Sequence, residues 1–399
     1  MKILIISQYF YPEAFRINLL SRELVRRGHD VTVLTGYPQY PGGRIYPGYG
    51  FAVPYEHEWN GVHIERVKAL PRGRTPLGLL FNCLSFVVRG KRWVRRCRTV
   101  YDVVYVFEVS PVTVGLPAVA YKKKTGAPVL FNVQDLWPES VEVVLGVKNR
   151  LVIGTINRIV DKIYAASDRI LCTSRGAVEN IAARGVERKK LVYWPQFAPE
   201  PELDGSEKPL EYSDEFFNIV FAGNIGEAQG LDLLVDAAAR LRGEKVRWFL
   251  VGDGRACARI RGRVTEAGLD ENVIFIGRVS EKEADRYVHY ADCAYLSFRK
   301  NKLFDIIIPA KLQTYLACGT PVLAVAGGES RDIVEKHGCG VSCGHDPAEV
   351  ADAVMRLRSD PAALEAMRTN ARNCYMSEFR CDMLTDRLED IMREVTGRE

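Results

Sequence analysis

The chain alternates apolar strand segments with amphipathic helices, and this alternation limits its possible folds more than any other feature. A continuous apolar run such as Lys2 to Ser7 is typical of a parallel strand buried on both faces. Strands joined by helices form right-handed crossovers and a parallel sheet covered by helices. The first half is predicted to hold strands at 2–7, 30–35, 103–107, 129–133 and 169–173, and helices at 17–27, 112–124 and 151–166.

A stretch rich in Pro, Glu and Asp, from Pro195 to Asp214, interrupts the pattern, which then starts again. The sequence therefore predicts an α/β fold of two Rossmann-like, doubly wound parallel-sheet domains that face a cleft. The domains are residues 1–200 and 201–378, with a C-terminal helix at 379–399 that packs back on the first domain. In the second half, strands are predicted at 217–222, 246–251, 272–276, 294–298 and 321–325, and helices at 231–241, 281–290, 311–317, 348–357 and from 362 onward.

Several common functional patterns are absent from the sequence. No Gly-x-Gly-x-x-Gly follows the first strand, and neither a Walker motif nor a Gly-x-Ser-x-Gly elbow occurs, which disfavours dinucleotide oxidoreductases, P-loop enzymes and α/β-hydrolases. The ten cysteines form no Cys-x-x-Cys pair, so free buried thiols are expected. The sequence shows no secretory signal pattern, and we expect a cytoplasmic protein.

Charge is unevenly distributed along the chain. Residues 1–200 carry 29 Lys and Arg against 16 Asp and Glu, whereas residues 201–399 carry 26 against 34. The first half is therefore predicted to meet an anionic partner such as a membrane surface, a lipid phosphate or nucleic acid. Nucleic acid is the poorest fit, because no known binding module accompanies the charge.

Glycines follow the first strand of the second half, at Gly223, Gly226 and Gly230, with Asn224 and Gln229 between them. Ligands of parallel α/β sheets bind beyond the carboxyl ends of strands. Glycines there let the backbone approach a ligand, and the amides of a helix start attract phosphate. An ordinary turn between strand and helix explains the same residues equally well, so both interpretations stay open.

Lys311 lies near the start of a predicted helix that Pro309 opens and Gly319 ends. The helix dipole favours acidic residues at that place. A cation there is explained if the lysine and the helix both point at a diphosphate. The alternative is a solvated lysine.

Six motifs recur in a characteristic order and spacing along the chain. They are Tyr9-Phe10-Tyr11-Pro12-Glu13 with Arg16 and Asn18, then Arg26 to Val33, Val133 to Glu139, Gly223 to Gly230, Val251 to Gly254, and Pro309 to Val322. With them the chain resembles family 4 of the glycosyltransferases, which has the two-domain arrangement called GT-B. It is similar in particular to the bacterial surface-polysaccharide subgroup of fucosamine and related amino-sugar transferases. The resemblance covers essentially the whole chain.

The resemblance implies a nucleotide diphosphate-sugar donor held mainly by the second domain and an acceptor held mainly by the first. It also implies retention of the anomeric configuration, no metal, and positive groups that stabilise the leaving diphosphate. The donor-binding residues are expected to be Arg16, Gly223, Asn224, Gly226, Gln229, Gly230, Asp253, Arg299, Lys311, Gln313 and Thr314. Turn chemistry alone explains Asp253 equally well.

The chain departs from the family pattern at several of these positions. Asn224 and Gln229 stand where the family has Arg and Lys, and Gln134 stands where a His is common. Ile306 and Thr314 replace the paired glutamates. Lys311, Arg299 and Arg16 are therefore expected to supply the positive charge, and Gln313 or Thr314 to replace the glutamate that holds the ribose.

Acidic residues in the strand-end loops of the first half are candidates for the chemistry. Asp135 directly follows an apolar strand and could take the proton of an acceptor hydroxyl, unless the donor phosphate takes it. Glu13 and Glu139 follow prolines, where a charge that caps a helix is as good an explanation as catalysis. The predicted catalytic residues are Asp135, Glu13 and Lys311, with Glu139 and Trp137 on the acceptor side.

Residues 72–98 carry eight Lys or Arg and no acid, around the apolar run 77–88. That run is too short to span a bilayer. An apolar and a basic helix as a pair would suit the surface of an anionic membrane. A buried helix followed by a solvated basic helix fits the composition equally well. The residues predicted to face the membrane are Arg89, Lys91, Arg92, Arg95 and Arg96.

The leading interpretation is a retaining transferase that moves an N-acetylated amino sugar from a UDP-sugar to a polyprenyl-diphosphate-linked saccharide, in O-antigen, capsule or exopolysaccharide synthesis. The UDP-sugar is a co-substrate, and no other cofactor and no metal is expected. The expected partners are this donor, the lipid-linked acceptor and the inner face of the cytoplasmic membrane, bound peripherally. Two alternatives are a nucleotide-sugar epimerase of the UDP-N-acetylglucosamine 2-epimerase type, which has no use for residues 72–98, and a non-catalytic nucleotide-sugar-binding protein.

Overall fold

The structure is a computed structural model that describes residues 1–73, 75–203 and 205–398. It divides into two compact units, of which unit 1 is Met1–Trp194 with Cys381–Glu399 and unit 2 is Pro195–Arg380. Arg74, one of the eight basic residues of 72–98, lies outside the described residues.

Unit 1 is built on an eight-stranded sheet. Its strands are β1 (Lys2–Ile6), β2 (Asp30–Thr35), β3 (Glu58–Trp59), β4 (Val62–Arg66), β5 (Val103–Glu108), β6 (Val129–Val133), β7 (Arg169–Cys172) and β8 (Leu191–Tyr193). They lie in the order β3-β4-β2-β1-β5-β6-β7-β8, and every neighbouring pair is parallel except β3 with β4. The central strands β5 and β6 are buried throughout, as their apolar sequences predict.

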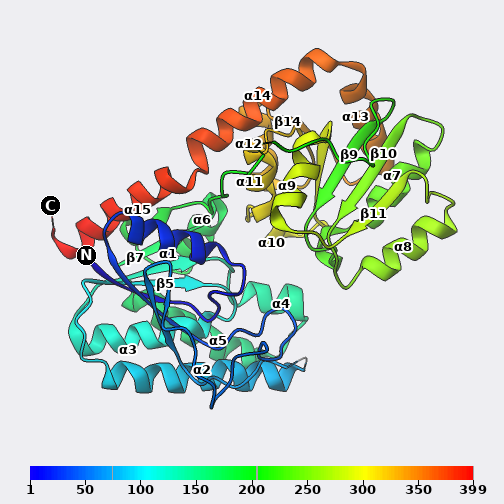
Figure 1. Ribbon diagram of the computed structural model, residues 1–399. Coiled ribbons are helices and arrows are strands. Elements are labelled where there is room, and N and C mark those ends of the chain that lie inside the picture. Colours follow the sequence, from blue (N-terminus) through cyan, green and yellow to red (C-terminus); the bar gives the residue numbers. More distant parts are fainter. Residues whose placement is uncertain (74, 204, 399) are drawn as a thin grey trace. The chain divides into compact units, whose positions relative to one another are not determined.

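Helices cover both faces of this sheet. They are α1 (Arg16–Arg26), α2 (Pro76–Arg96), α3 (Leu116–Thr125), α4 (Glu139–Leu145), α5 (Arg150–Ala166), α6 (Arg175–Ala183) and α15 (Cys381–Thr396). Figure 1 shows α1 and α15 on one face and α2, α3 and α5 on the other. The predicted pair of helices at 72–98 is wrong, because α2 is one helix of 21 residues. Gly90 does not end it but lets it approach α3, where a Cβ at Gly90 would lie 2.8 Å from Cγ of Pro117.

The last helix, α15, belongs to unit 1 and packs on α1. Its apolar face, with Leu384 and Leu388, is fully buried. Arg27 Nη1 donates to Glu389 Oε2 at 2.8 Å, and His29 Nε2 pairs with Glu389 Oε1 at 2.6 Å. These contacts give His29 a structural role.

Unit 2 is built on a six-stranded sheet. Its strands are β9 (Phe217–Ala222), β10 (Val246–Val251), β11 (Val273–Gly277), β12 (Cys293–Ser297), β13 (Val322–Val325) and β14 (Gly340–Ser342). They lie in the order β11-β10-β9-β12-β13-β14, and all neighbours are parallel. Their carboxyl ends therefore share one edge of the sheet, where ligands of such sheets bind.

The helices of unit 2 also cover both faces of their sheet. They are α7 (Asp232–Arg240), α8 (Cys257–Glu266), α9 (Glu281–Tyr290), α10 (Lys302–Asp305), α11 (Ala310–Ala317), α12 (Gly328–His337), α13 (Pro347–Ser359) and α14 (Pro361–Glu378). Figure 1 shows α7, α8 and α13 on one face and α9, α11 and α14 on the other. Two mostly parallel sheets, each covered by helices, confirm the predicted α/β fold.

Candidate functional site

The carboxyl ends of β9 and β10 form a close glycine turn in unit 2. Gly223 has a φ of 128° and Gly252 a φ of 132°, both in the left-handed region. A Cβ at Gly252 would lie only 2.0 Å from the carbonyl oxygen of Gly223. Only glycine permits this approach of two strand ends, and it leaves backbone without side chains at the edge where ligands bind.

Lys311 reaches this glycine turn from the first turn of α11. Its Nζ is buried 3.8 Å from the ring centre of Phe221, and a Cβ at Gly223 would lie 3.7 Å from it. In the part of the chain that the structure describes, this nitrogen has no hydrogen-bond partner. Burial lowers the pKa of Lys311 to about 7. A buried amine without a counter-charge is costly, and an anionic ligand would offset that cost.

The other polar residues of the turn mainly hold its shape. Gln229 Oε1 accepts a hydrogen bond from Gly226 N at 3.1 Å. A Cβ at Gly226 would lie 2.7 Å from Asn224 Nδ2. Asp253 Oδ1 accepts a hydrogen bond from the next backbone amide, Gly254 N, at 2.7 Å, so this side chain stabilises the turn itself.

Arg299 follows β12 and lies on an exposed charged cluster. Its Nη2 donates to Glu227 Oε2 at 2.7 Å, and Arg259 Nη2 donates to the same oxygen at 2.9 Å. The stem of Arg299 packs against Gly230, where a Cβ would lie 3.1 Å from Arg299 Cγ. The guanidinium is thus paired with a carboxylate in this structure.

Gln313 and Thr314 both interact with the first turn of their own helix. Gln313 is buried, and with its amide nitrogen assigned to that side it donates to the carbonyl oxygens of Pro309 and Ala310 at 3.1 and 3.2 Å. Thr314 Oγ1 donates to Ala310 O at 3.3 Å. The structure therefore gives Gln313 a role in holding the start of α11, which carries Lys311.

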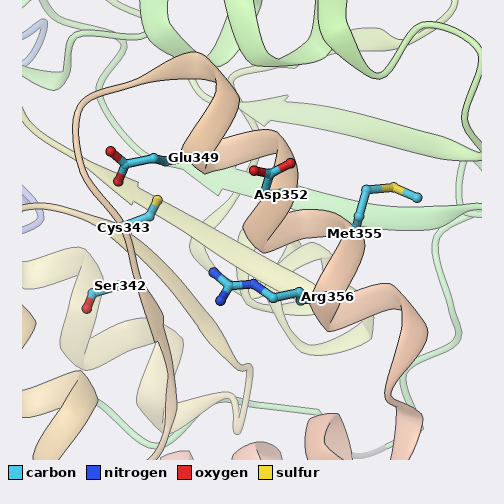
Figure 2. Close-up of a pocket in the computed structure, with 6 residues that line it drawn as sticks. All are labelled: Ser342, Cys343, Glu349, Asp352, Met355 and Arg356. Atoms are coloured by element: carbon cyan, nitrogen blue, oxygen red, sulfur yellow. The ribbon is translucent and has the colours of Figure 1, made fainter.

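A cavity of about 570 Å³ lies elsewhere in unit 2, beside the end of β14. Its lining is Ser342, Cys343, Glu349, Asp352, Met355 and Arg356. Figure 2 shows Arg356 reaching from α13 toward the loop that carries Ser342 and Cys343. The cavity contains none of the residues predicted to bind a donor, and its size alone does not make it the functional site.

In unit 1, Asp135 lies directly after β6, at the carboxyl edge of the sheet. Its Oδ2 accepts hydrogen bonds from Ser110 Oγ at 2.5 Å and from Ser110 N at 3.2 Å. The side chain is half-buried, and its Oδ1 receives no hydrogen bond from the described residues. The sequence places Asp135 at a strand end, and the structure adds the serine that holds one of its oxygens.

Glu108, at the end of β5, supports the loop that carries Asp135, and sequence reasoning missed it. Its Oε2 accepts from the backbone amides of Gln134 and Asp135, each at 3.0 Å. Burial, followed by the nearby charge of Asp135, raises the pKa of Glu108 well above the usual range. An acid at the end of the apolar run 103–107 is the same signal that singled out Asp135.

Trp137 and Glu139 follow Asp135 and are held inside the unit. Glu139 Oε1 accepts from Asn180 Nδ2 at 3.3 Å. Trp137 Nε1 is buried near the Glu108 carboxylate, whereas Glu139 Oε2 is buried without a hydrogen-bond partner among the described residues. Glu139 therefore retains an unused oxygen four residues after Asp135.

Glu13 is buried in the loop after β1 and accepts hydrogen bonds from three backbone amides. They come from Tyr40 at 2.6 Å, Gln39 at 2.7 Å and Phe10 at 3.3 Å. Burial raises the pKa of Glu13 to about 7. Arg66, also missed from the sequence, holds the same loops, since its Nη1 donates to Gly36 O at 2.8 Å. This geometry makes Glu13 an anchor of two strand-end loops.

Glu13→Ala should lower the free energy of unfolding by about 3 kcal/mol, because three buried amides lose their acceptor. Glu13→Gln keeps one acceptor oxygen and should cost less. Because the pKa of Glu13 is raised from 4.5 to about 7 on folding, the native state binds more protons between these pH values. Urea unfolding should therefore show wild-type stability falling, relative to Glu13→Gln, as pH rises from 5 to 8. A pH-independent difference would contradict this role.

The remaining predicted residues lie on two helices of unit 1. Arg16 is the first residue of α1 and is half-buried. Arg89, Arg92, Arg95 and Arg96 are exposed on α2, and Lys91 on the same helix is half-buried. Over the described chain, no helix is long and apolar enough to cross a bilayer. The described residues also contain no group of three or more His, Cys, Asp or Glu side chains placed to hold a metal ion.

Two family models match the two halves of the chain. Residues 14–196 match the glycosyl transferase 4-like domain, and residues 217–360 match glycosyl transferases group 1. The chain is 26% identical over 343 residues to WcaI of Escherichia coli K12, a protein named as a colanic acid biosynthesis glycosyl transferase. That match covers 80% of this chain and 82% of WcaI.

Solved structures with the same fold cover nearly the whole chain. Sucrose-phosphate synthase from Thermosynechococcus elongatus has a TM-score of 0.78 at 19% identity, with 99% of each chain covered. HepE from Anabaena, in complex with UDP-glucose, has a TM-score of 0.69 at 16% identity, covering 99% of this chain and 100% of HepE. WaaG, a glycosyltransferase of lipopolysaccharide biosynthesis, has a TM-score of 0.68 at 14% identity, covering 98% of this chain and 99% of WaaG. The two sheets and the family models over both halves make the chain a glycosyltransferase of the GT-B fold.

Proposed function

We propose that the protein transfers a sugar, with retention of anomeric configuration and without a metal, from a UDP-sugar to a lipid-linked saccharide. The observation that carries this proposal is the Nζ of Lys311, which is buried beside the glycine turn at Gly223 and has no hydrogen-bond partner among the residues described. A diphosphate at that strand end would give the amine a counter-charge and would hold it as an ammonium. The ammonium would in turn stabilise the negative charge that develops on the leaving UDP.

The transfer exchanges one bond for another. The bond between the sugar C1 and the β-phosphate oxygen breaks, and a bond between C1 and the acceptor oxygen forms. The proton of the acceptor hydroxyl goes to Asp135 or to the departing phosphate. Asp135 suits this role because its Oδ1 is not used by the described residues, while Ser110 holds Oδ2.

The relatives support the choice of donor and product. HepE has been solved with UDP and with UDP-glucose, WaaG acts in lipopolysaccharide biosynthesis, and WcaI is named for colanic acid biosynthesis. On this support we propose a role in bacterial surface-polysaccharide synthesis, such as that of O-antigen, capsule or exopolysaccharide. The family resemblance of the motifs favours an N-acetylated amino sugar as the transferred group and a polyprenyl-diphosphate-linked saccharide as the acceptor.

Thermal unfolding with a panel of nucleotide sugars tests the donor. UDP and one UDP-sugar should raise the melting temperature, because a ligand of the native state stabilises it. That UDP-sugar should then be consumed only when acceptor is present, with the anomeric configuration of the product read by NMR and with EDTA without effect. Stabilisation by GDP or dTDP compounds alone would contradict the UDP donor, and inversion or loss of turnover with EDTA would contradict the mechanism.

The exposed face of α2 supports peripheral binding at the inner face of the cytoplasmic membrane. At 100° per residue, five apolar side chains form one stripe along the helix, and Lys91, Arg92 and Arg95 continue it. The stripe begins at Leu77, which is 66% exposed, and ends at Val88, which is 64% exposed. The five are Leu77, Leu80, Phe81, Leu84 and Val88, which we call the α2 stripe. An apolar stripe that continues into cations without an acidic partner in the described part of the chain suits an anionic bilayer.

Replacing Arg92, Arg95 and Arg96 by Gln should reduce binding to vesicles that contain anionic lipid by roughly 100-fold or somewhat more, since each basic residue near such a surface contributes about 1 kcal/mol. Vesicle sedimentation at low and high salt measures this. Lys245, Arg278 and Lys282, all exposed in unit 2, provide a matched triple control. Equal partitioning of the two triple variants would favour a solvated basic helix instead.

A further inference from the structure

The loop before α2 places Arg72 against the first turn of that helix. A Cβ at Gly78 would lie 2.6 Å from the carbonyl oxygen of Arg72. The same loop is tied to the second turn of α2 by Asn82 Nδ2, which donates to Leu70 O at 2.6 Å. The backbone amide of Arg72 donates to Gln39 Oε1, in the loop after β2. Arg72 is therefore fixed where α2 meets the carboxyl edge of the sheet of unit 1.

The guanidinium of Arg72 has aromatic neighbours and no acidic partner among the described residues. It lies 5.9 Å from the ring centre of Tyr40, which is 41% exposed, and close to the hydroxyl of Tyr9. That hydroxyl is buried, the Arg72 guanidinium is near enough to donate to its oxygen, and its own proton has no acceptor in the described chain. A cation and an orphaned donor thus lie side by side, and an anionic oxygen between them would complete both.

The first turn of α2 adds to the positive potential at this place. The helix has 21 residues and no acidic residue in its first turn. Thr75 Oγ1 accepts from Gly78 N at 3.1 Å, and the partial positive charge of the helix start remains without a carboxylate. Two residues after this cap, the α2 stripe begins with Leu77. A positively charged region and an apolar surface are therefore continuous along one helix.

We propose that Arg72, the Tyr9 hydroxyl and the first turn of α2 bind the phosphate or diphosphate of an isoprenoid-linked acceptor, whose hydrocarbon chain lies on the α2 stripe. This deepens the proposed function and rests on it only in taking the acceptor to be lipid-linked. Phosphate beside hydrocarbon is the chemistry that the site recognises. The aromatic ring of Tyr40 packs beside the guanidinium and would close the site toward the sugar end.

Binding of farnesyl diphosphate to the full chain, measured by calorimetry, tests the site without any turnover. Arg72→Gln should weaken this binding by about 10- to 100-fold, as expected for the loss of a charge-assisted contact. Arg72→Lys should recover part of the affinity, since it keeps the charge but not the planar fork. Arg98→Gln, an exposed arginine after α2, is the matched control and should bind as wild type does.

Inorganic diphosphate, farnesol and lipid vesicles distinguish an isoprenoid diphosphate from free phosphate and from bilayer headgroups. Inorganic diphosphate and farnesol should each bind the wild-type chain far more weakly than farnesyl diphosphate. If inorganic diphosphate bound equally well, the lipid part of the proposal would be overturned, and equal binding of farnesol would overturn the phosphate part. If Arg72→Gln bound farnesyl diphosphate normally but lost vesicle binding, Arg72 would serve bilayer headgroups instead.

The same variants keep this proposal separate from the donor assignment. Arg72→Gln should retain wild-type melting temperature and wild-type stabilisation by UDP, because Lys311 and its glycine turn lie in unit 2. If the wild-type chain bound farnesyl diphosphate through Arg72 but bound no UDP compound, the proposed UDP donor would be wrong and the phosphate site would still be supported. A chain that binds UDP but shows no effect of Arg72→Gln on farnesyl diphosphate would refute the phosphate site alone.

Discussion

Lys311→Ala should lower the affinity of the protein for UDP by about 10- to 100-fold, the usual effect of removing one charge-assisted contact. The loss should be larger for UDP than for uridine, because the amine is proposed to meet the phosphates. Calorimetry with both ligands measures the difference. Lys302→Ala, an exposed lysine on α10, is the control and should leave both affinities unchanged. Equal losses for uridine and UDP would show that Lys311 does not contact the diphosphate.

The same lysine should make the ligand-free protein less stable than an isosteric variant. Folding lowers the pKa of Lys311 from 10.5 to about 7, so the native state binds fewer protons than the unfolded state between these values. Burial of the charged amine therefore lowers the free energy of unfolding by its full amount below pH 7, and this penalty disappears as pH rises toward 10.5. Lys311→Met should therefore stabilise the ligand-free protein by roughly 3–5 kcal/mol near pH 7 and by little near pH 10.

With UDP bound, the wild-type protein should be more stable than Lys311→Met. Because a diphosphate holds the amine as an ammonium, binding should take up a proton above pH 7, and the affinity of the wild-type chain for UDP should fall with rising pH. Lys311→Met should bind UDP weakly and without this pH dependence. Stability curves of wild type and Lys311→Met that run parallel from pH 6 to pH 10 would rule out a buried, titrating amine at this place.

Asp135→Asn should reduce kcat by about 10²- to 10⁴-fold, the usual contribution of a general base, while UDP affinity stays as in wild type. The substitution keeps the shape of the side chain and its contact with Ser110 but removes its charge. Ser110→Ala should have a smaller effect, because it removes only the donor that orients one oxygen. Single-turnover transfer to a lipid-linked acceptor measures both variants.

A kcat within tenfold of wild type in Asp135→Asn would assign the proton to the donor phosphate instead. A lowered kcat accompanied by an equally weakened affinity for the acceptor would indicate a role in positioning the acceptor.

The fold was predictable wherever the apolar pattern was strong. The central strands at 2–6, 103–108 and 217–222 are buried on both faces, and such strands are continuous apolar runs in the sequence. Short edge strands carry no such pattern, and β3, with two residues, and β8 and β14, with three each, were missed. β4, which lies inside the sheet, was missed as well, because its buried residues alternate with more exposed ones. The change of composition at Arg89 suggested a second helix, but composition does not break a helix, and Gly90 serves packing on α3.

The candidate site was only partly predictable, because its parts are assembled by contacts between distant residues. Position in the sequence identified Lys311 as a cation at a helix start, but only the fold shows that its amine is buried and that no described residue pairs with it. The pairing of Arg299 with Glu227 joins residues 72 positions apart. Glu108 supports a loop that begins 26 residues later. Such pairings have no local signature in the sequence.

The return of α15 to unit 1 has a consequence for synthesis on the ribosome. Unit 2 is one continuous stretch, so all of its residues are synthesised before α15. Unit 1 starts before unit 2 but is completed only after it, since Leu384 and Leu388 of α15 are fully buried in unit 1. A premature stop after Arg380 would therefore spare the inserted unit and damage the one made earlier.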